Sequence, residues 1–208
     1  MSSTAVFVTH AATIQVPSDH SSIQAAISAA ADGDTVLVWP GVYSESKTID
    51  FFGKDIRVVS ESGPEETIID GSSLGSTQEQ AIVIFQSGET PSSILEGFTI
   101  RNADWNRRAG IYIESASPTI RRNVIVHNAT GTFGGIYLRD STALIEENYI
   151  LENQGTLAGG ISISGGSPSI LRNAIVSNRS VSSGGTSGLW ISGAALVKDN
   201  LIASEELT

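Results

Sequence analysis

Short apolar runs of three to five residues recur through the second half of the chain. Each run is rich in Ile, Val, Leu and Tyr, and each is bounded by Gly, Asn, Ser or Pro. Apolar runs of this length with such boundaries predict short β-strands separated by turns. The runs lack the 3.6-residue period of an amphipathic helix. This half of the chain is therefore predicted to be built from strands.

The runs return with a fixed period, which two kinds of residue measure independently. Glycines that open one class of strand are separated by 25, 25 and 28 residues: Gly110, Gly135, Gly160 and Gly188. One column of asparagines has separations of 25, 25 and 27 residues: Asn123, Asn148, Asn173 and Asn200. A second has separations of 26, 25 and 25 residues: Asn102, Asn128, Asn153 and Asn178. A unit of about 25 residues with three strands is one triangular coil, and such coils bury their apolar faces only by stacking.

The two asparagine columns have a mechanical explanation. Stacked coils place like residues over like, about 4.8 Å apart. A side-chain amide has both donor and acceptor groups, so stacked asparagines can hydrogen-bond from one coil to the next. Asparagine also tolerates the left-handed backbone that sharp corners need. All eight asparagines are therefore assigned a structural role.

The N-terminal region follows a different pattern, which predicts a short strand over residues 13–17 and a helix within residues 21–34. Ser21 and Gln24 have the spacing of a capping box, and Gly33 supplies a C-terminal stop. Four apolar residues share one face of this helix: Ile23, Ala26, Ile27 and Ala30. A small amphipathic helix of this kind is suited to cover the open end of a stacked core.

The chain is expected to form one domain with three segments. Residues 1–12 are expected to be disordered or the remnant of a signal peptide, residues 13–34 to form the strand and capping helix, and residues 35–208 to form the coils. The repeat that begins at Ala195 breaks off before its glycine-led strand, so the last coil is expected to be incomplete. Either the chain is a fragment of a longer protein, which we favour, or two open ends associate end to end.

Charge and composition exclude several classes of function. The chain has 12 Lys and Arg against 22 Asp and Glu, a formal charge of −10. This balance argues against nucleic acid and against an anionic membrane surface as partners. The absence of cysteine excludes disulfides, thiolate catalysis and Cys-ligated metals. No apolar run approaches the ~20 residues that span a bilayer.

Several segments resemble the pectin-lyase-like right-handed parallel β-helix superfamily. They are SIQAAISAAADGDTVLVWPGVYSE, DIRVVSESGPEETIIDG, GFTIRN and the coils that contain GIYL. The resemblance covers roughly residues 13–204 and implies an all-β, single-stranded parallel β-helix of three sheets. It also implies export, to a secreted, periplasmic or cell-surface location, and a ligand groove over the glycine-led sheet. Its members range from polysaccharide lyases, hydrolases, epimerases and carbohydrate esterases to phage tailspikes and non-catalytic surface proteins, so the fold alone does not select a reaction.

Alternation along the glycine-led strands places several aromatic side chains on the outer face of that sheet. Tyr112, Tyr137 and Trp190 lie on the strands, and Trp105 lies in a preceding loop. Flat rings cover the apolar faces of a pyranose while polar groups fix its hydroxyls, so these four are candidate carbohydrate-binding residues. The alternative is plain sheet packing, in which stacked aromatic and charged pairs each contribute roughly 0.2–1 kcal/mol.

A complete catalytic set is not found in the sequence. Hydrolysis of a glycosidic bond needs two flanking carboxylates, and Asp104, Glu114 and Asp140 come from neighbouring coils without forming a repeated pair. Arg139 beside Asp140 is the nearest approach to a calcium-dependent lyase. No metal site or cofactor is therefore predicted, and calcium bound by these acids is the alternative.

The leading hypothesis is a non-catalytic, exported β-helix that presents a surface to a polysaccharide or a cell-surface partner. It follows from a complete scaffold signature without a complete catalytic set. The first alternative is a polysaccharide lyase or glycoside hydrolase that uses Asp104, Glu114, Arg139 and Asp140. The second is a structural stalk within a larger surface protein.

Overall fold

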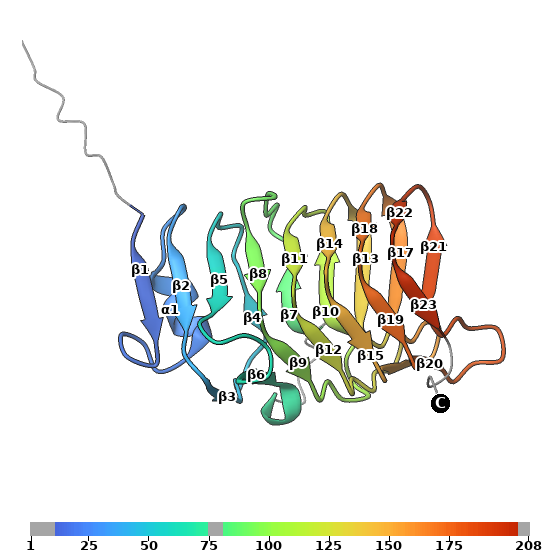
Figure 1. Ribbon diagram of the computed structural model, residues 1–208, viewed down its shortest axis with the longest axis horizontal. Coiled ribbons are helices and arrows are strands. Elements are labelled where there is room, and N and C mark those ends of the chain that lie inside the picture. The colour runs from blue at the N-terminus through green and yellow to red at the C-terminus, as the bar shows by residue number, and fades with distance from the viewer. Residues whose placement is uncertain (1–10, 75–80, 204–208) are drawn as a thin grey trace, which may run out of the picture.

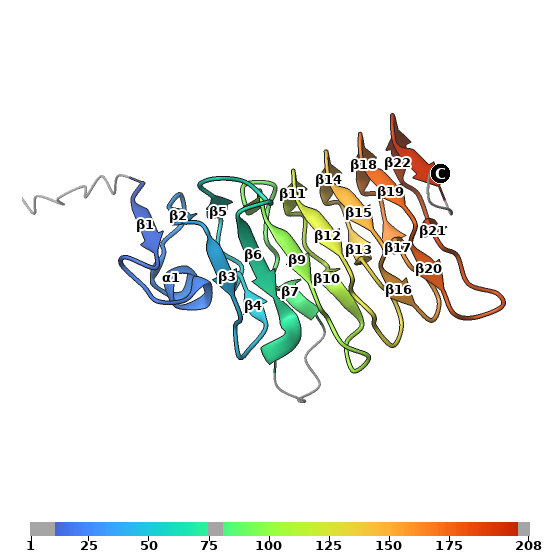
Figure 2. The ribbon, with the colours of Figure 1, turned by 60° about the horizontal axis from the view of Figure 1, so that its bottom comes forward.

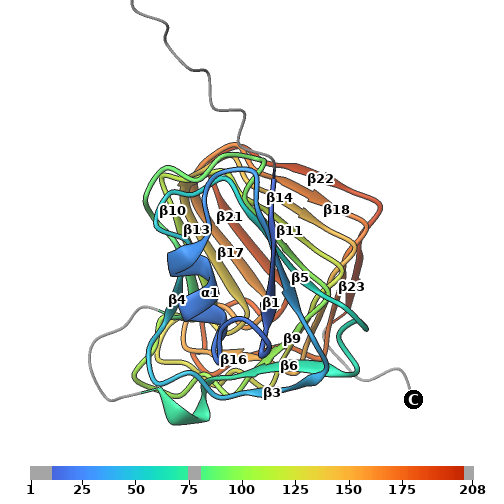
Figure 3. The same cartoon turned by 90° about the vertical axis from the view of Figure 1, so that its left-hand side faces the viewer.

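A computed structural model of the protein describes residues 11–74 and 81–203. Within these ranges the chain winds into a right-handed parallel β-solenoid of about seven turns (Figure 1). Figure 3, which looks along the solenoid from its N-terminal end, shows three sides around a common interior. The predicted fold class, a parallel β-helix of three sheets with a short N-terminal helix, is confirmed.

Three long sheets make up the sides of the solenoid. Sheet A has eight strands: β1 (Thr13–Val16), β2 (Thr35–Val38), β5 (Arg57–Ser60), β8 (Ile94–Glu96), β11 (Thr119–Arg121), β14 (Leu144–Glu146), β18 (Ser169–Leu171) and β22 (Leu196–Lys198). Sheet B has seven: β3 (Gly41–Tyr43), β6 (Thr67–Asp70), β9 (Thr99–Arg101), β12 (Val124–Val126), β15 (Tyr149–Leu151), β19 (Ala174–Val176) and β23 (Leu201–Ala203). Sheet C, the glycine-led sheet, has six: β4 (Ile49–Asp50), β7 (Ala81–Phe85), β10 (Ala109–Glu114), β13 (Ile136–Ser141), β17 (Ile161–Gly166) and β21 (Leu189–Ser192). A fourth, two-stranded sheet pairs β16 (Gln154–Gly155) with β20 (Arg179–Ser180).

The core consists of columns of inward-pointing residues, one residue from each coil. Strands of sheets A and B are mostly three residues long, and in the three-residue strands from β8 onward the middle residue points inward. Parallel pairing in register aligns these residues, and five successive members of the sheet B column are fully buried: Ile69, Ile100, Ile125, Ile150 and Ile175. Each side chain is covered by its counterparts in the neighbouring coils, so the core exists only as a stack.

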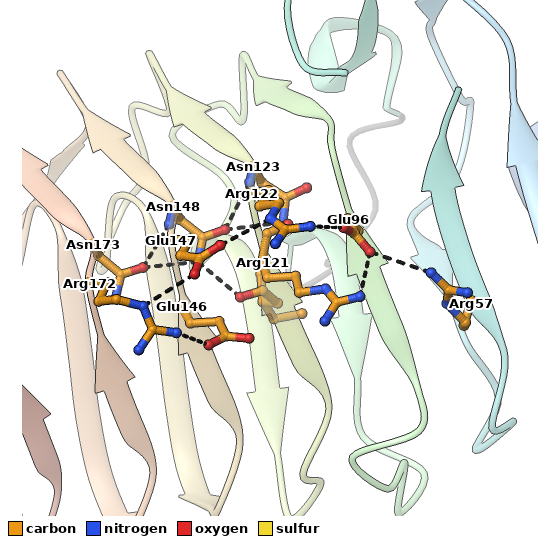
Figure 4. Close-up of polar contacts among 11 residues, drawn as sticks. Arg57, Glu96, Arg121, Arg122, Asn123, Glu146, Glu147, Asn148, Arg172 and Asn173 are labelled. Carbon is orange, nitrogen blue, oxygen red and sulfur yellow. Dashed lines mark hydrogen bonds and ion pairs between the residues drawn. The ribbon is translucent and has the colours of Figure 1, made fainter. Parts of the chain in front are cut away.

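Two asparagine ladders run along the corners on either side of sheet B. In the first, Asn148 donates from its backbone N–H and from Nδ2 to Oδ1 of Asn173, both at 3.0 Å. Its own Oδ1 accepts the same two bonds from Asn123, at 3.0 and 3.2 Å (Figure 4). Asn200 is the last rung of this ladder. The second ladder has the same geometry and joins three residues: Asn128, Asn153 and Asn178.

Asn102 is not a rung of the second ladder, and the sequence interpretation of this residue is wrong. Ala103 takes the place below Asn128, whose Oδ1 accepts the Ala103 backbone N–H at 2.9 Å. Asn102 instead has φ of 65° and donates from Nδ2 to Asp70. The left-handed residue at these corners is the one before each ladder asparagine, for example Glu147, with φ of 56°. The 26-residue spacing of Asn102 was the signal that it lies out of register.

The glycines that open the sheet C strands are required by the close stacking of the backbone. A Cβ built on Gly135 would lie 2.6 Å from the carbonyl oxygen of Gly160. A Cβ on Gly160 would lie even closer to the carbonyl oxygen of Gly188 and 2.7 Å from Cγ2 of Ile175. Real Cβ atoms essentially never approach other atoms within 3.0 Å. Glycine is therefore required in this column because the neighbouring coil leaves no space for a side chain.

The predicted capping helix is α1 (Ile23–Ala29), and its apolar face is buried as expected. The N-cap is Ser22 and not Ser21, because Ser22 Oγ accepts the backbone N–H of Ala25 at 3.2 Å. Gln24 takes no part in a capping box. Its side chain instead bonds both backbone groups of Asp50 in β4, at 2.7 and 3.1 Å. The helix is thereby joined to the end of sheet C.

The C-terminal end of α1 is fixed by a lysine from a later loop. Lys54 Nζ donates to the carbonyl oxygens of Ile27, Ser28 and Ala30, at 2.7, 2.8 and 2.7 Å. A cation at this end also interacts favourably with the helix dipole. The cap residue is Ala30, whereas Gly33, with φ of 90°, lies in the turn that follows. The helix therefore stops before the predicted glycine.

The two ends of the described solenoid differ. Helix α1 covers the first coil, whereas the last described coil exposes its inward-facing residues Ile191, Val197 and Ile202.

The predicted disordered or signal-derived segment 1–12 lies outside the described residues except for Ala11 and Ala12. No helix within residues 11–74 and 81–203 is long and apolar enough to cross a membrane.

Acid sensitivity is expected to involve Asp70, which begins the short 3₁₀ turn η1 (Gly71–Ser73). Burial raises the pKa of Asp70, but hydrogen bonds from Ser72, Asn102 and Arg101 outweigh this effect and lower the pKa to about 2. A carboxylate with a lowered pKa contributes stability above its unfolded-state pKa and loses it as the pH falls through the folded-state value. Asp70→Asn should therefore lower the free energy of unfolding by about 1–2 kcal/mol at neutral pH.

This difference between the parent protein and Asp70→Asn should shrink as the pH falls from about 4 to about 2, as measured by urea unfolding at each pH. Asp140→Asn, at an exposed carboxylate, is the control and should change little. A constant difference between parent and Asp70→Asn across this pH range would contradict the assignment.

Candidate functional site

The outer face of sheet C carries one column of three aromatic residues and a serine. Register aligns them in four successive coils: Tyr112, Tyr137, Ser162 and Trp190. Because Ser162 is small and fully buried, it leaves a gap between the rings of Tyr137 and Trp190. The column therefore contains a depression rather than a continuous aromatic stack.

This depression is the aromatic cleft, with a volume of about 150 Å³. Its lining comes from three coils and their loops: Phe133, Tyr137, Leu157, Ser164, Gly184 and Trp190. The rings of Phe133 and Tyr137 stack at one wall, with centroids 4.0 Å apart and planes inclined by 24°. Trp190 contributes to the lining from β21 and is 40% exposed. Loop residues Leu157 and Gly184 were not identified from the sequence, because their loops show no aromatic or charged signal.

Tyr112 was expected to contact a ligand, and this expectation is wrong because its side chain is 0% exposed. Its ring packs 5.5 Å from that of Tyr137, centroid to centroid. Its hydroxyl donates to Glu114 Oε2 at 2.7 Å. Burial and this bond to a carboxylate raise the pKa of Tyr112 to about 12. Tyr112 therefore packs against Tyr137 from the neighbouring coil, and Tyr137 itself is only 8% exposed.

Ser162 has a polar group without a visible partner. Its Oγ atom is buried and forms no hydrogen bond with any residue of the described ranges. A buried hydroxyl without a partner is disfavoured by roughly 1–3 kcal/mol. Register places Ser162 directly between Tyr137 and Trp190, beneath the cleft. Ser162 is fully buried and does not line the cleft, so its hydroxyl is not exposed to a ligand there.

The charged candidates on this face are paired with one another. Arg139 Nη1 lies 3.0 Å from Glu114 Oε1, and Arg139 Nε lies 4.0 Å from Asp140 Oδ2. Both oxygens of Glu114 are thus engaged, one by Arg139 and one by Tyr112. Arg139 aligns with Ser164 of the cleft, so this cluster lies beside the cleft.

Asp104 and Trp105 lie in the loop between β9 and β10, outside the lining of the cleft. Asp104 accepts the backbone N–H of Asn106 and lies 3.7 Å from Nε of Arg107. Trp105 is exposed. Of the four weak catalytic candidates, the structure brings Glu114, Arg139 and Asp140 together, and no contact joins Asp104 to them among the described residues. Within residues 11–74 and 81–203, no three His, Cys, Asp or Glu residues are grouped as metal ligands would be.

A comparison with protein families agrees with the observed fold. A family model described as right handed beta helix region matches residues 56–206. A similar solved structure is the crystal structure of a pectin methylesterase mutant in complex with a hexasaccharide, with 13% sequence identity and a TM-score of 0.46. The alignment covers 93% of this chain and 67% of that chain. No curated protein matches the sequence. At such low identity, neither the residues nor the chemistry of the esterase is transferred to this chain.

Proposed function

The chain belongs to the right-handed β-helix family, and from this premise we propose that it is a non-catalytic protein that binds carbohydrate in the aromatic cleft of sheet C. The observation that carries the proposal is the cleft between the stacked Phe133–Tyr137 pair and Trp190. Trp190 is exposed and Phe133 is half-buried. Aromatic rings beside a hydroxyl group suit a sugar ring, which is apolar above and below and polar at the edge.

The size of the cleft limits what it can hold. Its volume of about 150 Å³ is below the ~300–1,000 Å³ of sites for drug-sized ligands. We therefore propose that one sugar ring, at a chain end or a branch, occupies it. Ser164 in the lining supplies a hydroxyl group for the polar edge of that ring. Arg139 and Asp140, on the strand that carries Tyr137, supply charged groups nearby.

The arrangement of Glu114 supports binding without turnover. A general base needs a free carboxylate oxygen within reach of the substrate, and both oxygens of Glu114 are bonded within the protein. The remaining acids, Asp104 and Asp140, do not form a pair across the cleft. Two carboxylates flanking one bond are the usual requirement for glycoside hydrolysis.

Binding is tested by calorimetric titration with neutral and acidic oligosaccharides. We expect Trp190→Ala to weaken the affinity about tenfold, equivalent to ~1.4 kcal/mol, because one ring contact is lost. Trp105→Ala removes an exposed tryptophan outside the cleft and should leave the affinity unchanged. In a Trp39→Phe/Trp105→Phe background Trp190 is the only remaining tryptophan, and its fluorescence should change on titration.

Two results would overturn the proposal. If Trp105→Ala abolished binding and Trp190→Ala did not, the sugar would bind elsewhere. If the protein released unsaturated products or reducing ends from a polysaccharide, and Glu114→Gln abolished that release, the protein would be an enzyme. Absence of binding to every oligosaccharide would favour the structural stalk.

A further inference from the structure

The outer face of sheet B carries an apolar surface that the sugar-binding proposal does not use. In the last four strands of this sheet, the residues on either side of the inward-facing middle residue are all apolar. They form the sheet B patch: Val124, Val126, Tyr149, Leu151, Ala174, Val176, Leu201 and Ala203. Figure 2 shows that β12, β15 and β19 run side by side on this face. Contiguous apolar patches with polar rims mark interaction sites on soluble proteins.

The sheet B patch has a protrusion beside a hollow. Tyr149 is 57% exposed and Leu201 is 52% exposed, whereas Ala174 lies between them in the same column. The hollow over Ala174 measures about 340 Å³ and is lined by both large residues. A surface with a large side chain next to a gap of this kind can interlock with a reversed copy of itself.

The rim next to this column carries charges that alternate from coil to coil. The four residues at equivalent corner positions are Arg122, Glu147, Arg172 and Asp199. Glu147 lies between the two arginines, 3.0 Å from Arg122 and 3.2 Å from Arg172, which holds these side chains along the corner (Figure 4). The opposite rim carries His127 and Glu152, which contact each other at 2.5 Å.

We propose that two copies of the chain associate through the sheet B patch, face to face, about a two-fold axis that runs parallel to the strands and passes between β15 and β19. This operation places Tyr149 of each copy over Ala174 of the other, in the hollow. It also places Glu147 opposite Arg172 and Arg122 opposite Asp199, so every charge on this rim meets its opposite. The interface is isologous, as in most homodimers.

Three other arrangements of the same faces bring like charges together. Moving the axis onto β15 places Arg122 opposite Arg172, and moving it onto β19 places Glu147 opposite Asp199. A two-fold axis along the solenoid places Glu147 opposite Glu152. Like charges at an interface oppose association and so select the register. The alternation along the rim therefore selects the direction of the second copy and an axis that passes between strands. Among such axes, the one between β15 and β19 pairs all four rim charges.

The overlap involves four coils, or about 19 Å of the solenoid at ~4.8 Å per coil. A contact of this length across one sheet buries a small area for a protein interface. The dissociation constant is therefore expected to be micromolar. Sheet C forms a different side of the solenoid, so the aromatic cleft stays open in the dimer (Figure 3).

Sedimentation equilibrium of the 208-residue chain, from about 5 µM to about 300 µM, spans the expected dissociation constant. The parent protein should change from monomer to dimer over this range. Tyr149→Ser removes the protruding ring and Ala174→Phe fills the hollow, and each should raise the dissociation constant at least tenfold. Val42→Ser is the matched control, because Val42 is an exposed residue of the same column outside the overlap. Circular dichroism checks that each variant is folded.

A monomer throughout this range would overturn the proposal. So would a dimer that both Tyr149→Ser and Ala174→Phe leave unchanged. End-to-end association through the last coil is distinguished by Val197→Lys, which introduces a charge at the exposed end of the core. A dimer that Val197→Lys dissociates while Tyr149→Ser does not would place the contact at the end of the solenoid.

Discussion

Replacing Asn148 by Leu is expected to lower the free energy of unfolding by about 3–5 kcal/mol, because a middle rung of the first ladder is removed. Leu has a similar volume but cannot hydrogen-bond. The change leaves the backbone N–H of Asn123 without its acceptor and removes the Nδ2 donor from the carbonyl oxygen of Ile120. Nδ2 of Asn123 also loses one of its three acceptors but keeps the carbonyl oxygens of Leu95 and Arg121. All these groups are buried, so water does not replace the lost bonds without a change in structure.

Urea unfolding followed by circular dichroism measures this effect. Asn200→Leu is the matched control at the last rung, where the side chain is only partly buried and bonds a coil on one side among the described residues. Its effect should be less than half that of Asn148→Leu. Equal losses for the two variants would show that the stability of the ladder does not depend on burial between coils.

Gly160→Ala is expected to lower the free energy of unfolding by about 3 kcal/mol or more, because the added methyl group has no space. The nearest atoms are the carbonyl oxygen of Gly188 and Cγ2 of Ile175, one in the next coil and one in the core. Neither can move without separating β17 from β21 or displacing the core column. The loss therefore comes from overpacking.

The control for this variant is Gly184→Ala, since a Cβ at Gly184 meets nothing within 4 Å. This substitution should change the midpoint of thermal unfolding by no more than about 2 °C. Gly160→Ala should lower the midpoint by at least about 6 °C. A change of equal size at both sites would mean that the lost chain flexibility of glycine, and not the stacking distance, sets the effect.

The fold can be predicted because the 25-residue repeat is visible in the sequence itself. Coils of equal length place like residues in contact, so one glycine column and two asparagine columns determine register without any knowledge of the loops. The error at Asn102 has the same origin, because a single residue of extra spacing separates a rung from its left-handed neighbour. The register of the coils can be assigned by counting residues only where successive coils contain the same number of residues.

The candidate site could be predicted only in part. Alternation identifies which side of a strand faces outward, and it places Tyr137 and Trp190 correctly on the outer face of sheet C. It does not predict that Tyr112 is covered, because the covering depends on neighbouring rings and on loops. Leu157 and Gly184 lie in those loops, whose paths follow from packing and not from a repeat. The N-cap at Ser22 illustrates the same limit on a local scale, since the capping-box spacing of Ser21 and Gln24 predicted the wrong one of two adjacent serines.

The asparagine ladders also give the solenoid a direction. Each rung donates to the rung of the following coil and accepts from the rung of the preceding one, as from Asn123 to Asn148 to Asn173. The bond dipoles point the same way, so they add and each polarises the next. During translation, every finished coil would present a backbone N–H and an amide N–H to the coil that emerges after it. Growth by templated addition would thus follow the order in which the ribosome delivers the chain.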